Sequence, residues 1–430
     1  MNLLRTARHL LLAGLALLTT AVVWHNWGDL LTQPDAAISP TSPSTAPTLQ
    51  RGHYLVQAGN CITCHTNRGQ PPLAGGRAIE TPFGPVYSSN LTPDPDTGLG
   101  QWTALDFWRA LHHGRSRGGR LLAPAFPYEH TSVITREDSD TMFAWLHSQP
   151  AVKQAQPAHG LTWPLGTQAA LAVWRTLYFS PATFQPDTQQ STEWNRGAYL
   201  VQGLGHCAAC HSPRNALGAT QGVSDLSGGL MPVVNWYAPD LTSDRETGLA
   251  STPLADVVQL LRSGTNGQAH TSGPMSEVVQ HSLQHLSPAD VQAMAVYLRS
   301  RVRPDTASVS TAVRRIPSTV AERGLKVYER HCVSCHGEQG QGAPGIYPAL
   351  AGNRAVLLAE QTNLVQAILY GGYGPATAGH PRPFGMPPFV LELDDRDMAA
   401  VLTHIRSQWG NAAGEVTPLQ VNRIRAASAQ

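Results

Sequence analysis

The chain of 430 residues is poor in cysteine, methionine and charge: it has six cysteines and seven methionines, and 14% of its residues are charged. A formal net charge of +1 provides neither a basic surface for nucleic acid nor a strong field to steer a partner. It contains no G-x-S-x-G or H-E-x-x-H motif, and no nucleotide-binding glycine motif between a predicted strand and a helix. We therefore expect no substrate pocket and no nucleic-acid partner.

All six cysteines belong to three copies of one motif, C-x-x-C-H, which begin at residues 61, 207 and 332. This motif is typical of c-type haem attachment, in which both thiols form thioethers and the histidine ligates the iron. A zinc site would need further ligands nearby, and a redox dithiol would not require the histidine three times. We predict three covalently bound haem c groups and no disulfides. The attachment residues are Cys61, Cys64, Cys207, Cys210, Cys332 and Cys335, and the proximal ligands are His65, His211 and His336.

The N-terminus has a positive flank, Arg5 and Arg8, before an apolar stretch from Leu10 to Trp24. This order predicts export, either as a cleaved signal or as a transmembrane anchor within residues 1–31. No small-residue cleavage site follows the stretch, which favours the uncleaved anchor. The haem domains are then expected on the periplasmic face of the bacterial inner membrane. Residues 39–48, rich in Pro, Ser and Thr, predict a flexible tether.

The sequence around each motif repeats as well. A helical lead-in precedes each motif, and an apolar-periodic helix with an N-terminal start signal closes each segment. These features predict a mostly α fold with three tandem cytochrome c-type (class I-like) haem domains, at 46–150, 191–303 and 319–412. We call them the first, second and third modules.

Two segments lie outside the repeat. Residues 171–179 form an apolar patch, for which we expect a helix packed between two haem modules, or else a docking surface for a partner subunit or the bilayer interface. The tail, 413–430, is expected to be peripheral, with residues 421–424 as a short clamp.

The sixth iron ligand distinguishes the modules. Met275 and Met386 lie in Gly/Pro loops, 64 and 50 residues beyond their proximal histidines, and are predicted as distal ligands. Met294 and Met398 lie on the apolar stripe of closing helices and are predicted to be core residues. The matching position of the first module is Phe126.

For the first haem we predict His130 as the sixth ligand, 65 residues beyond His65. His112, His113 and a five-coordinate iron remain alternatives. Two histidine ligands should give the first haem a lower potential than the other two.

These motifs resemble the three-haem cytochrome c subunits of membrane-bound bacterial dehydrogenases, over residues 46–412. The most specific stretch runs from Glu193 to Asn215, with support from residues 90–94 and 385–387. Family members serve alcohol, gluconate and sorbitol dehydrogenases that hold pyrroloquinoline quinone or flavin. Others serve molybdenum hydroxylases of aldehydes or nicotinate, which work with an iron–sulfur subunit. The alcohol and gluconate group usually has Pro-Ala-Met-Pro-Tyr where this chain has Phe126, so its first module looks more like the molybdenum group.

The resemblance implies an electron-transfer subunit that is no enzyme on its own. Its electrons would come from a periplasmic dehydrogenase, a molybdenum enzyme rather than the alternative quinoprotein or flavoprotein. They would pass to ubiquinone or a terminal oxidase. Two other interpretations remain: a haem peroxidase with an open first haem, because Phe126 replaces the expected methionine, and a free soluble electron shuttle.

Overall fold

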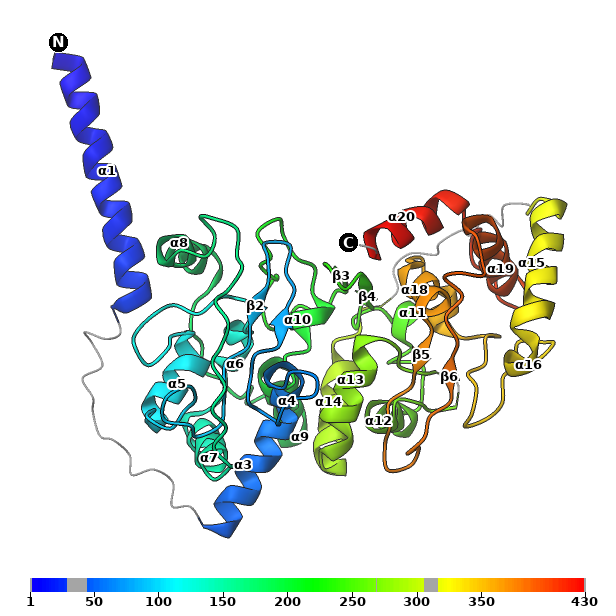
Figure 1. Cartoon of the computed structure of the whole chain (residues 1–430), viewed down its shortest axis with the longest axis horizontal. Helices are drawn as coiled ribbons and strands as arrows, with labels where there is room; N and C mark the ends of the chain where they lie inside the picture. Colours follow the sequence, from blue (N-terminus) through cyan, green and yellow to red (C-terminus); the bar gives the residue numbers. More distant parts are fainter. Residues whose placement is uncertain (1, 29–44, 268, 305–315, 429–430) are drawn as a thin grey trace. The chain divides into compact units, whose positions relative to one another are not determined.

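The computed structural model describes residues 2–28, 45–267, 269–304 and 316–428, and within these the fold is mostly helical, as predicted (Figure 1). Contacts divide the chain into two compact units. The first contains Met1–Leu55 and Cys64–Phe184, and the second contains Val56–Thr63 and Gln185–Gln430. Most of the predicted tether lies outside the described residues, but its last three residues, 46–48, already belong to a helix.

The elements as far as Phe184 are mainly helices with one short antiparallel hairpin. They are α1 (Asn2–Trp27), α3 (Ala46–Ala58), α4 (Cys61–His65), β1 (Ala78–Ile79), β2 (Val86–Tyr87), α5 (Ala104–His113), α6 (Tyr128–Thr131), α7 (Arg136–His147) and α8 (Gln168–Tyr178). Within α1, residues His9–Trp27 are long and apolar enough to cross a membrane, a criterion that a signal sequence also meets.

The elements after Phe184 include two more antiparallel hairpins. The helices as far as residue 300 are α9 (Thr192–Tyr199), the π-helix η1 (Leu200–Leu204), α10 (Ala208–His211), α11 (Asp244–Thr247), α12 (Leu254–Ser263), α13 (Pro274–His281), the 3₁₀-helix η2 (Leu283–His285) and α14 (Pro288–Ser300). The later helices are α15 (Ser318–His331), α16 (Val333–His336), α17 (Arg354–Leu357), α18 (Thr362–Tyr370), α19 (Asp395–Ser407) and α20 (Pro418–Ser428). The strands are β3 (Gly229–Met231), β4 (Trp236–Ala238), β5 (Gly372–Tyr373) and β6 (Gly385–Met386).

One helix crossing occurs three times, between α3 and α7, α9 and α14, and α15 and α19. Each lead-in helix places a glycine against a backbone carbonyl of the closing helix, where a Cβ atom would collide. The glycines are Gly52, Gly197 and Gly324, and the carbonyl oxygens belong to Thr141, Ala293 and Ala400. The two helices of each pair can therefore pack closely only because the lead-in position has no side chain.

An arginine directly before each of these glycines pairs with an aspartate in the first turn of the closing helix. The pairs are Arg51–Asp138 at 2.5 Å, Arg196–Asp290 at 2.7 Å and Arg323–Asp397 at 3.3 Å. The backbone N–H of each aspartate is also capped by a side chain, from Thr135, Ser287 and Asp394 respectively. The three modules therefore also share the contacts that hold the lead-in helix against the closing helix. The sequence pattern did not predict these contacts.

The core of the third module contains the C-terminal tail. Val421 of α20 is fully buried with Val401 and Met398, and the Arg425 guanidinium lies 2.8 Å from the Asp395 carboxylate. The tail is therefore not peripheral, because α20 completes this core, but the clamp expected at residues 421–424 is present, since Ile424 packs against the core beside Val421. Met398 and Met294 are both buried, which confirms them as core residues.

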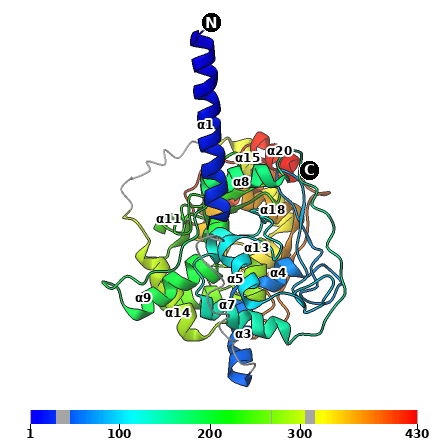
Figure 2. The same ribbon diagram turned by 90° about the vertical axis from the view of Figure 1, so that its left-hand side faces the viewer.

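The apolar patch at 171–179 forms α8, which packs against the last turn of α1 (Figure 2). The Asn26 amide donates to the carbonyl oxygen of Ala172 at 3.0 Å and accepts from Arg175 Nε at 2.8 Å. Leu171 and Ala172 are buried against Val22 and Trp27 of α1. α8 therefore packs on the last turn of α1 within the first unit, a contact that the sequence did not predict.

Candidate haem sites

Each C-x-x-C-H motif lies in a short helical segment, formed by α4, α10 and α16. One helical turn brings residues three positions apart to the same side, so the two thiols of a motif face one way. None of the six cysteines forms a disulfide in the structure. Each motif therefore presents two thiols and a histidine within little more than one turn.

The three predicted proximal histidines share one orienting contact. The Nδ1–H of each ring donates to a backbone carbonyl: His65 to Ser89 at 2.7 Å, His211 to Pro239 at 2.7 Å and His336 to Pro348 at 3.0 Å. Because a carbonyl only accepts, Nε2 is the unprotonated nitrogen and is available to a metal. Burial lowers the pKa of all three rings, which keeps them neutral and able to ligate.

Cys207 of the second motif and Cys332 of the third do not have the property of a reactive thiol. Burial raises the pKa of Cys207 to about 12 and that of Cys332 to about 11. Redox-active C-x-x-C motifs instead lower the pKa of a thiol. Within the described residues, no group of three or more His, Cys, Asp and Glu side chains is arranged to hold a metal ion. The residues fit the covalent attachment of haem better than either alternative.

The two predicted distal methionines lie beside backbone turns that require glycine. Met275 is in the first turn of α13, two residues after Gly273, which has a φ of +55° and lies against Trp236. Met386 is in β6, and its carbonyl oxygen lies where a Cβ atom of Gly371 would be. Both methionines are partly buried. Each methionine thus lies beside a glycine of positive φ, but Met275 belongs to a helix and Met386 to a strand, so neither lies in the loop expected from the sequence.

The matching segment of the first module has three buried histidines. His130, in α6, is 1% exposed, and His113 and His112, at the end of α5, are 7% and 8% exposed. The two helices contact each other through the Thr131 hydroxyl, which donates to the carbonyl oxygen of Leu111 at 2.7 Å. The His112 ring donates from Nδ1 to the Ser132 carbonyl at 2.5 Å and stacks on Trp108. All three candidates therefore lie in one buried region, and Phe126 precedes α6 by two residues.

The chain leading to the first motif contacts the chain leading to the second. The ring of His206, the residue before Cys207, bonds to the backbone carbonyl of Gly59. The Ser282 hydroxyl donates to the neighbouring carbonyl of Ala58 at 3.1 Å. His206 has a φ of +35°, which is rare for a residue with a large side chain, so its surroundings must hold this conformation. Sequence reasoning missed this junction, whose only sign was a histidine before the second motif.

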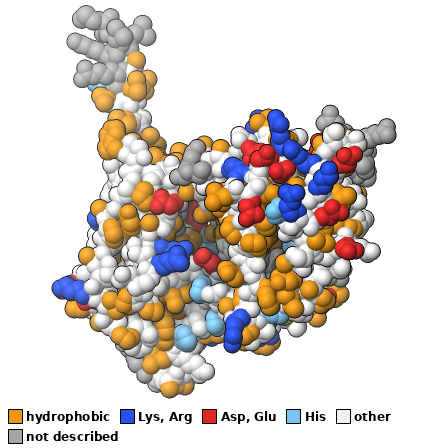
Figure 3. Space-filling view, turned by 45° about the vertical axis from the view of Figure 1, so that its right-hand side comes forward, with side chains coloured by type: hydrophobic (Ala, Val, Ile, Leu, Met, Phe, Trp, Pro, Cys, Tyr) orange, Lys and Arg blue, Asp and Glu red, His pale blue; other side chains and the backbone are white. Residues whose placement is uncertain are grey.

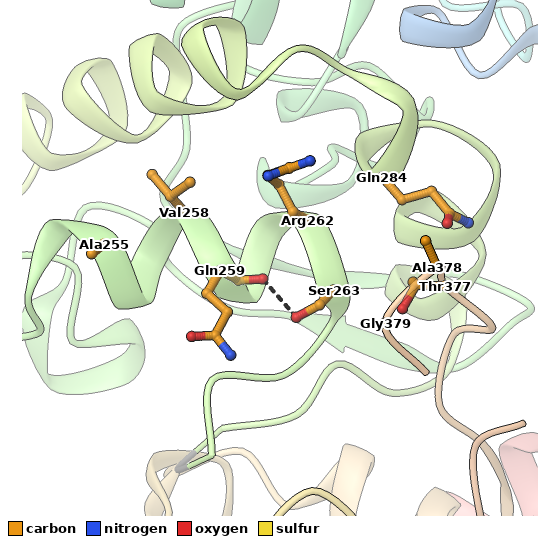
Figure 4. Close-up of a pocket in the computed structure, with 9 residues that line it drawn as sticks. All are labelled: Ala255, Val258, Gln259, Arg262, Ser263, Gln284, Thr377, Ala378 and Gly379. Carbon is orange, nitrogen blue, oxygen red and sulfur yellow. Dashed lines mark hydrogen bonds between the residues drawn. The ribbon is translucent and has the colours of Figure 1, made fainter. Parts of the chain in front are cut away.

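A separate cavity of about 350 Å³ lies in the second unit, between α12 and the loop that joins β5 to β6 (Figure 4). Its lining includes Val258, Arg262, Gln284 and Thr377. None of the predicted haem residues lines it. The cavity is therefore a feature of the contact between α12 and this loop, and is distinct from the candidate haem sites.

The family model of cytochrome c matches residues 321–409, which contain the third motif and Met386. The chain is similar to known proteins over most of its length. It is 36% identical over 394 residues to the gluconate 2-dehydrogenase cytochrome c subunit of Pantoea cypripedii, covering 88% of this chain and 89% of that protein. It is also 36% identical over 405 residues to the cytochrome c subunit of alcohol dehydrogenase (quinone) of Gluconacetobacter polyoxogenes, covering 90% and 86% respectively.

A third relative is a nicotinate dehydrogenase subunit of Pseudomonas putida, which is 37% identical over 429 residues. The match covers 95% of this chain but only 34% of that protein. The chain belongs to the family of cytochrome c subunits of bacterial dehydrogenases, which confirms the resemblance seen in the motifs. Membership implies covalently bound haem c and a role in electron transfer.

Proposed function

We propose that this chain is an exported triheme cytochrome, anchored by α1 to the periplasmic face of the bacterial inner membrane. It takes electrons from a periplasmic dehydrogenase and delivers them to ubiquinone or a terminal oxidase. Haem c supplies a one-electron iron centre, and the protein supplies the attachment, the iron ligands and the placement of each centre.

The threefold repetition of one structural unit carries this proposal. Each copy combines a C-x-x-C-H helix, a proximal histidine oriented by a backbone carbonyl, and a lead-in glycine packed on a closing helix. These parts lie far apart in the sequence of each copy and still recur together. Such agreement supports three equivalent haem domains, because a chance C-x-x-C-H motif would not bring the same supporting contacts.

Each haem is proposed to be held by its own motif. The attachment pairs are Cys61 and Cys64, Cys207 and Cys210, and Cys332 and Cys335, with His65, His211 and His336 as proximal ligands. Met275 and Met386 are proposed as distal ligands of the second and third haems. In the first module, His130 is proposed as the distal ligand, and the burial of its side chain, which is 1% exposed, supports this choice.

We propose a molybdenum-containing dehydrogenase with an iron–sulfur subunit as the partner. The carrying observation is Phe126, which stands where the quinoprotein group usually has methionine. The identities to the relatives are too similar to separate the groups, at 36% for gluconate and alcohol dehydrogenase subunits and 37% for the nicotinate dehydrogenase subunit. A quinoprotein or flavoprotein partner is the competing assignment.

The haem number is tested by expressing the full chain with a c-type maturation system. Intact mass and a pyridine haemochrome assay should give three haems per chain. Replacing both cysteines of one motif with alanine should remove one haem, whichever motif is chosen. Fewer than three haems in the unsubstituted chain, or a pair whose loss removes none, would contradict the proposal.

The partner is tested by purifying the tagged chain from native membranes under mild detergent. The associated subunits should contain molybdenum and an iron–sulfur cluster. Recovery with pyrroloquinoline quinone or flavin would instead support the competing partner. Recovery in the soluble periplasmic fraction with no partner would favour a free shuttle.

A further inference from the structure

The outer face of α8 is apolar although it does not pack on the protein. Ala169, Val173 and Leu177 are spaced four residues apart and form one stripe along the helix. Val173 is 50% exposed and Leu177 is 62% exposed. The only charged residue of α8, Arg175, points the other way and is buried. An exposed apolar stripe on a surface helix is a candidate interaction site.

The position of α8 along α1 is fixed by a buried polar contact. Asn26 is 1% exposed and Arg175 is 2% exposed, and the Arg175 guanidinium also lies over the rings of Tyr128 and Phe179. His25 adds a hydrogen bond of 2.8 Å to the Phe179 carbonyl. Separating the helices would leave buried polar groups without these partners, so α8 stays at the last turn of α1.

The length of α1 then determines where α8 lies relative to the surface of the membrane. The apolar stretch His9–Trp27 has 19 residues, which at about 1.5 Å each approach the roughly 30 Å hydrocarbon thickness of a bilayer. Figure 3 shows hydrophobic side chains along the part of α1 that stands clear of the rest of the first unit. Trp24 and Trp27 close this stretch, and tryptophan favours the membrane–water interface. The residues that hold α8 therefore lie at headgroup height.

Positive charge lies beside the same end of α1. The indole N–H of Trp27 donates to the Gly119 carbonyl at 3.4 Å, in a loop that exposes Arg117 and Arg120. Exposed arginines at this height match anionic lipid headgroups. Trp163, 83% exposed, lies in the segment that leads into α8. The chemistry around α8 therefore combines an apolar stripe, a tryptophan and basic side chains.

We propose that α8 is an interfacial helix, whose Ala169–Val173–Leu177 stripe lies in the headgroup region of an anionic bilayer beside the exit of α1. This proposal rests on the proposed anchoring of α1. Interfacial helices have this form, with an apolar face in the membrane surface and basic residues near the phosphates. The contact holds the first unit against the membrane at two places, and a single anchor would leave it free to turn.

The test uses the full holoprotein and a single new thiol. Because haem attachment consumes all six cysteines, Val173→Cys or Leu177→Cys provides the only free site for a nitroxide label. Leu15→Cys labels the middle of α1, and Leu391→Cys, where the leucine is 96% exposed on the second unit, gives an aqueous control. Each protein is reconstituted, without any dehydrogenase, into vesicles of phosphatidylethanolamine and phosphatidylglycerol. Collision rates with oxygen and with a water-soluble nickel chelate report the depth of each label.

Labels at 173 and 177 should show several-fold lower nickel accessibility than the label at 391, at a depth shallower than that of the label at 15. Labels at 173 and 177 as accessible as that at 391, with the label at 15 deep, would overturn the interfacial helix and leave the anchor intact. An aqueous label at 15 would overturn the anchor itself. Protection at 173 and 177 only after a dehydrogenase subunit is added would assign α8 to a protein partner instead.

Discussion

The first module differs from the second and third at one position within a shared scaffold. All three have the motif helix, the carbonyl-oriented histidine and the glycine at the helix crossing. The second and third each have a methionine beside a glycine-dependent turn, whereas the matching position of the first is Phe126, in a module with three buried histidines. The backbone therefore repeats, while the residue proposed for the distal position does not.

This difference shows which parts of the unit can vary. The crossing glycines face backbone atoms, which cannot move aside without breaking the closing helix. The proposed distal residues instead lie outside the crossing helices, so a change of side chain there leaves the helix pairs intact. The proposed haem attachment is therefore the same in all three modules, and the proposed differences in potential come from residues outside the crossing helices.

The largest effect is expected at the crossing glycines. Gly197→Val or Gly324→Val places methyl groups against a carbonyl of the closing helix and should prevent the helix pair from closing. We expect a loss of several kcal/mol, enough to unfold the module and reduce its haem incorporation. The matched control is Gly414→Ala, at a position with no heavy atom within 4 Å, which should leave haem content and the thermal midpoint unchanged. Equal behaviour of the two changes would show that close crossing is unimportant.

The second largest effect is expected on the midpoint potentials of the haems, when the proposed distal ligands are substituted. Met386→Leu and Met275→Leu should each lower the midpoint potential of one haem, on the order of 100 mV, and open that iron to carbon monoxide. Phe126→Met should raise the potential of the first haem by a similar amount, on the order of 100 mV, if the methionine displaces the histidine. Met294→Leu, in the core of α14, is the control and should leave all potentials unchanged. Unchanged potentials in Met386→Leu would remove that residue from the ligand set.

The next smaller effect is on the free energy of unfolding, to which the arginine–aspartate pairs should contribute unequally. Arg196 makes two bonds to Asp290, at 2.8 and 2.7 Å, and is less exposed than Arg323, whose approach to Asp397 is 3.3 Å. Arg196→Met should therefore lower the free energy of unfolding by about 1–2 kcal/mol, and Arg323→Met by less than about 1 kcal/mol. Urea unfolding followed by circular dichroism measures both. The reverse order would show that the pairs do not set the strength of the crossings.

The smallest expected effect is a loss of stability at acidic pH that is specific to the third closing helix, α19. Its cap is the carboxylate of Asp394, whereas the other two caps are the hydroxyls of Thr135 and Ser287. A hydrogen bond from the backbone N–H of Asp397 lowers the pKa of Asp394. Because the folded-state pKa is the lower one, the stabilisation is present above the unfolded pKa of about 4 and is lost as the pH falls through the folded pKa.

Replacing this carboxylate with a hydroxyl isolates its contribution. Asp394→Ser should remove the acid-dependent part of the stability of the third module, at most about 1 kcal/mol because the group is exposed. Thermal unfolding between pH 3 and pH 7 follows the change. An unaltered pH profile in Asp394→Ser would assign the acid sensitivity to other carboxylates.

The helical C-x-x-C-H segments and the closing helices could be predicted because their signals are local in the sequence. C-x-x-C-H fixes its own geometry within one turn, and start signals such as the Ser287 cap mark the closing helices. Packing between residues that lie far apart in the sequence could not be predicted. The sequence indicated the clamp at residues 421–424, but the burial of Val421 in the core of the third module and the Asn26–Arg175 contact join residues far apart in the chain, so the central place of α20 and the packing of α8 on α1 could not be predicted. The His206–Gly59 junction was missed for the same reason.

The central claim is that three haems share one scaffold but have unequal iron ligands, and a potentiometric titration of the full chain followed by low-temperature electron paramagnetic resonance tests it most directly. We predict three low-spin haems, one with a lower potential and two histidine ligands and two with higher potentials and His/Met ligation. The low-potential signal should be lost in His130→Ala and kept in His113→Ala. Three haems of equal, high potential, or a high-spin first haem that binds peroxide, would contradict the account.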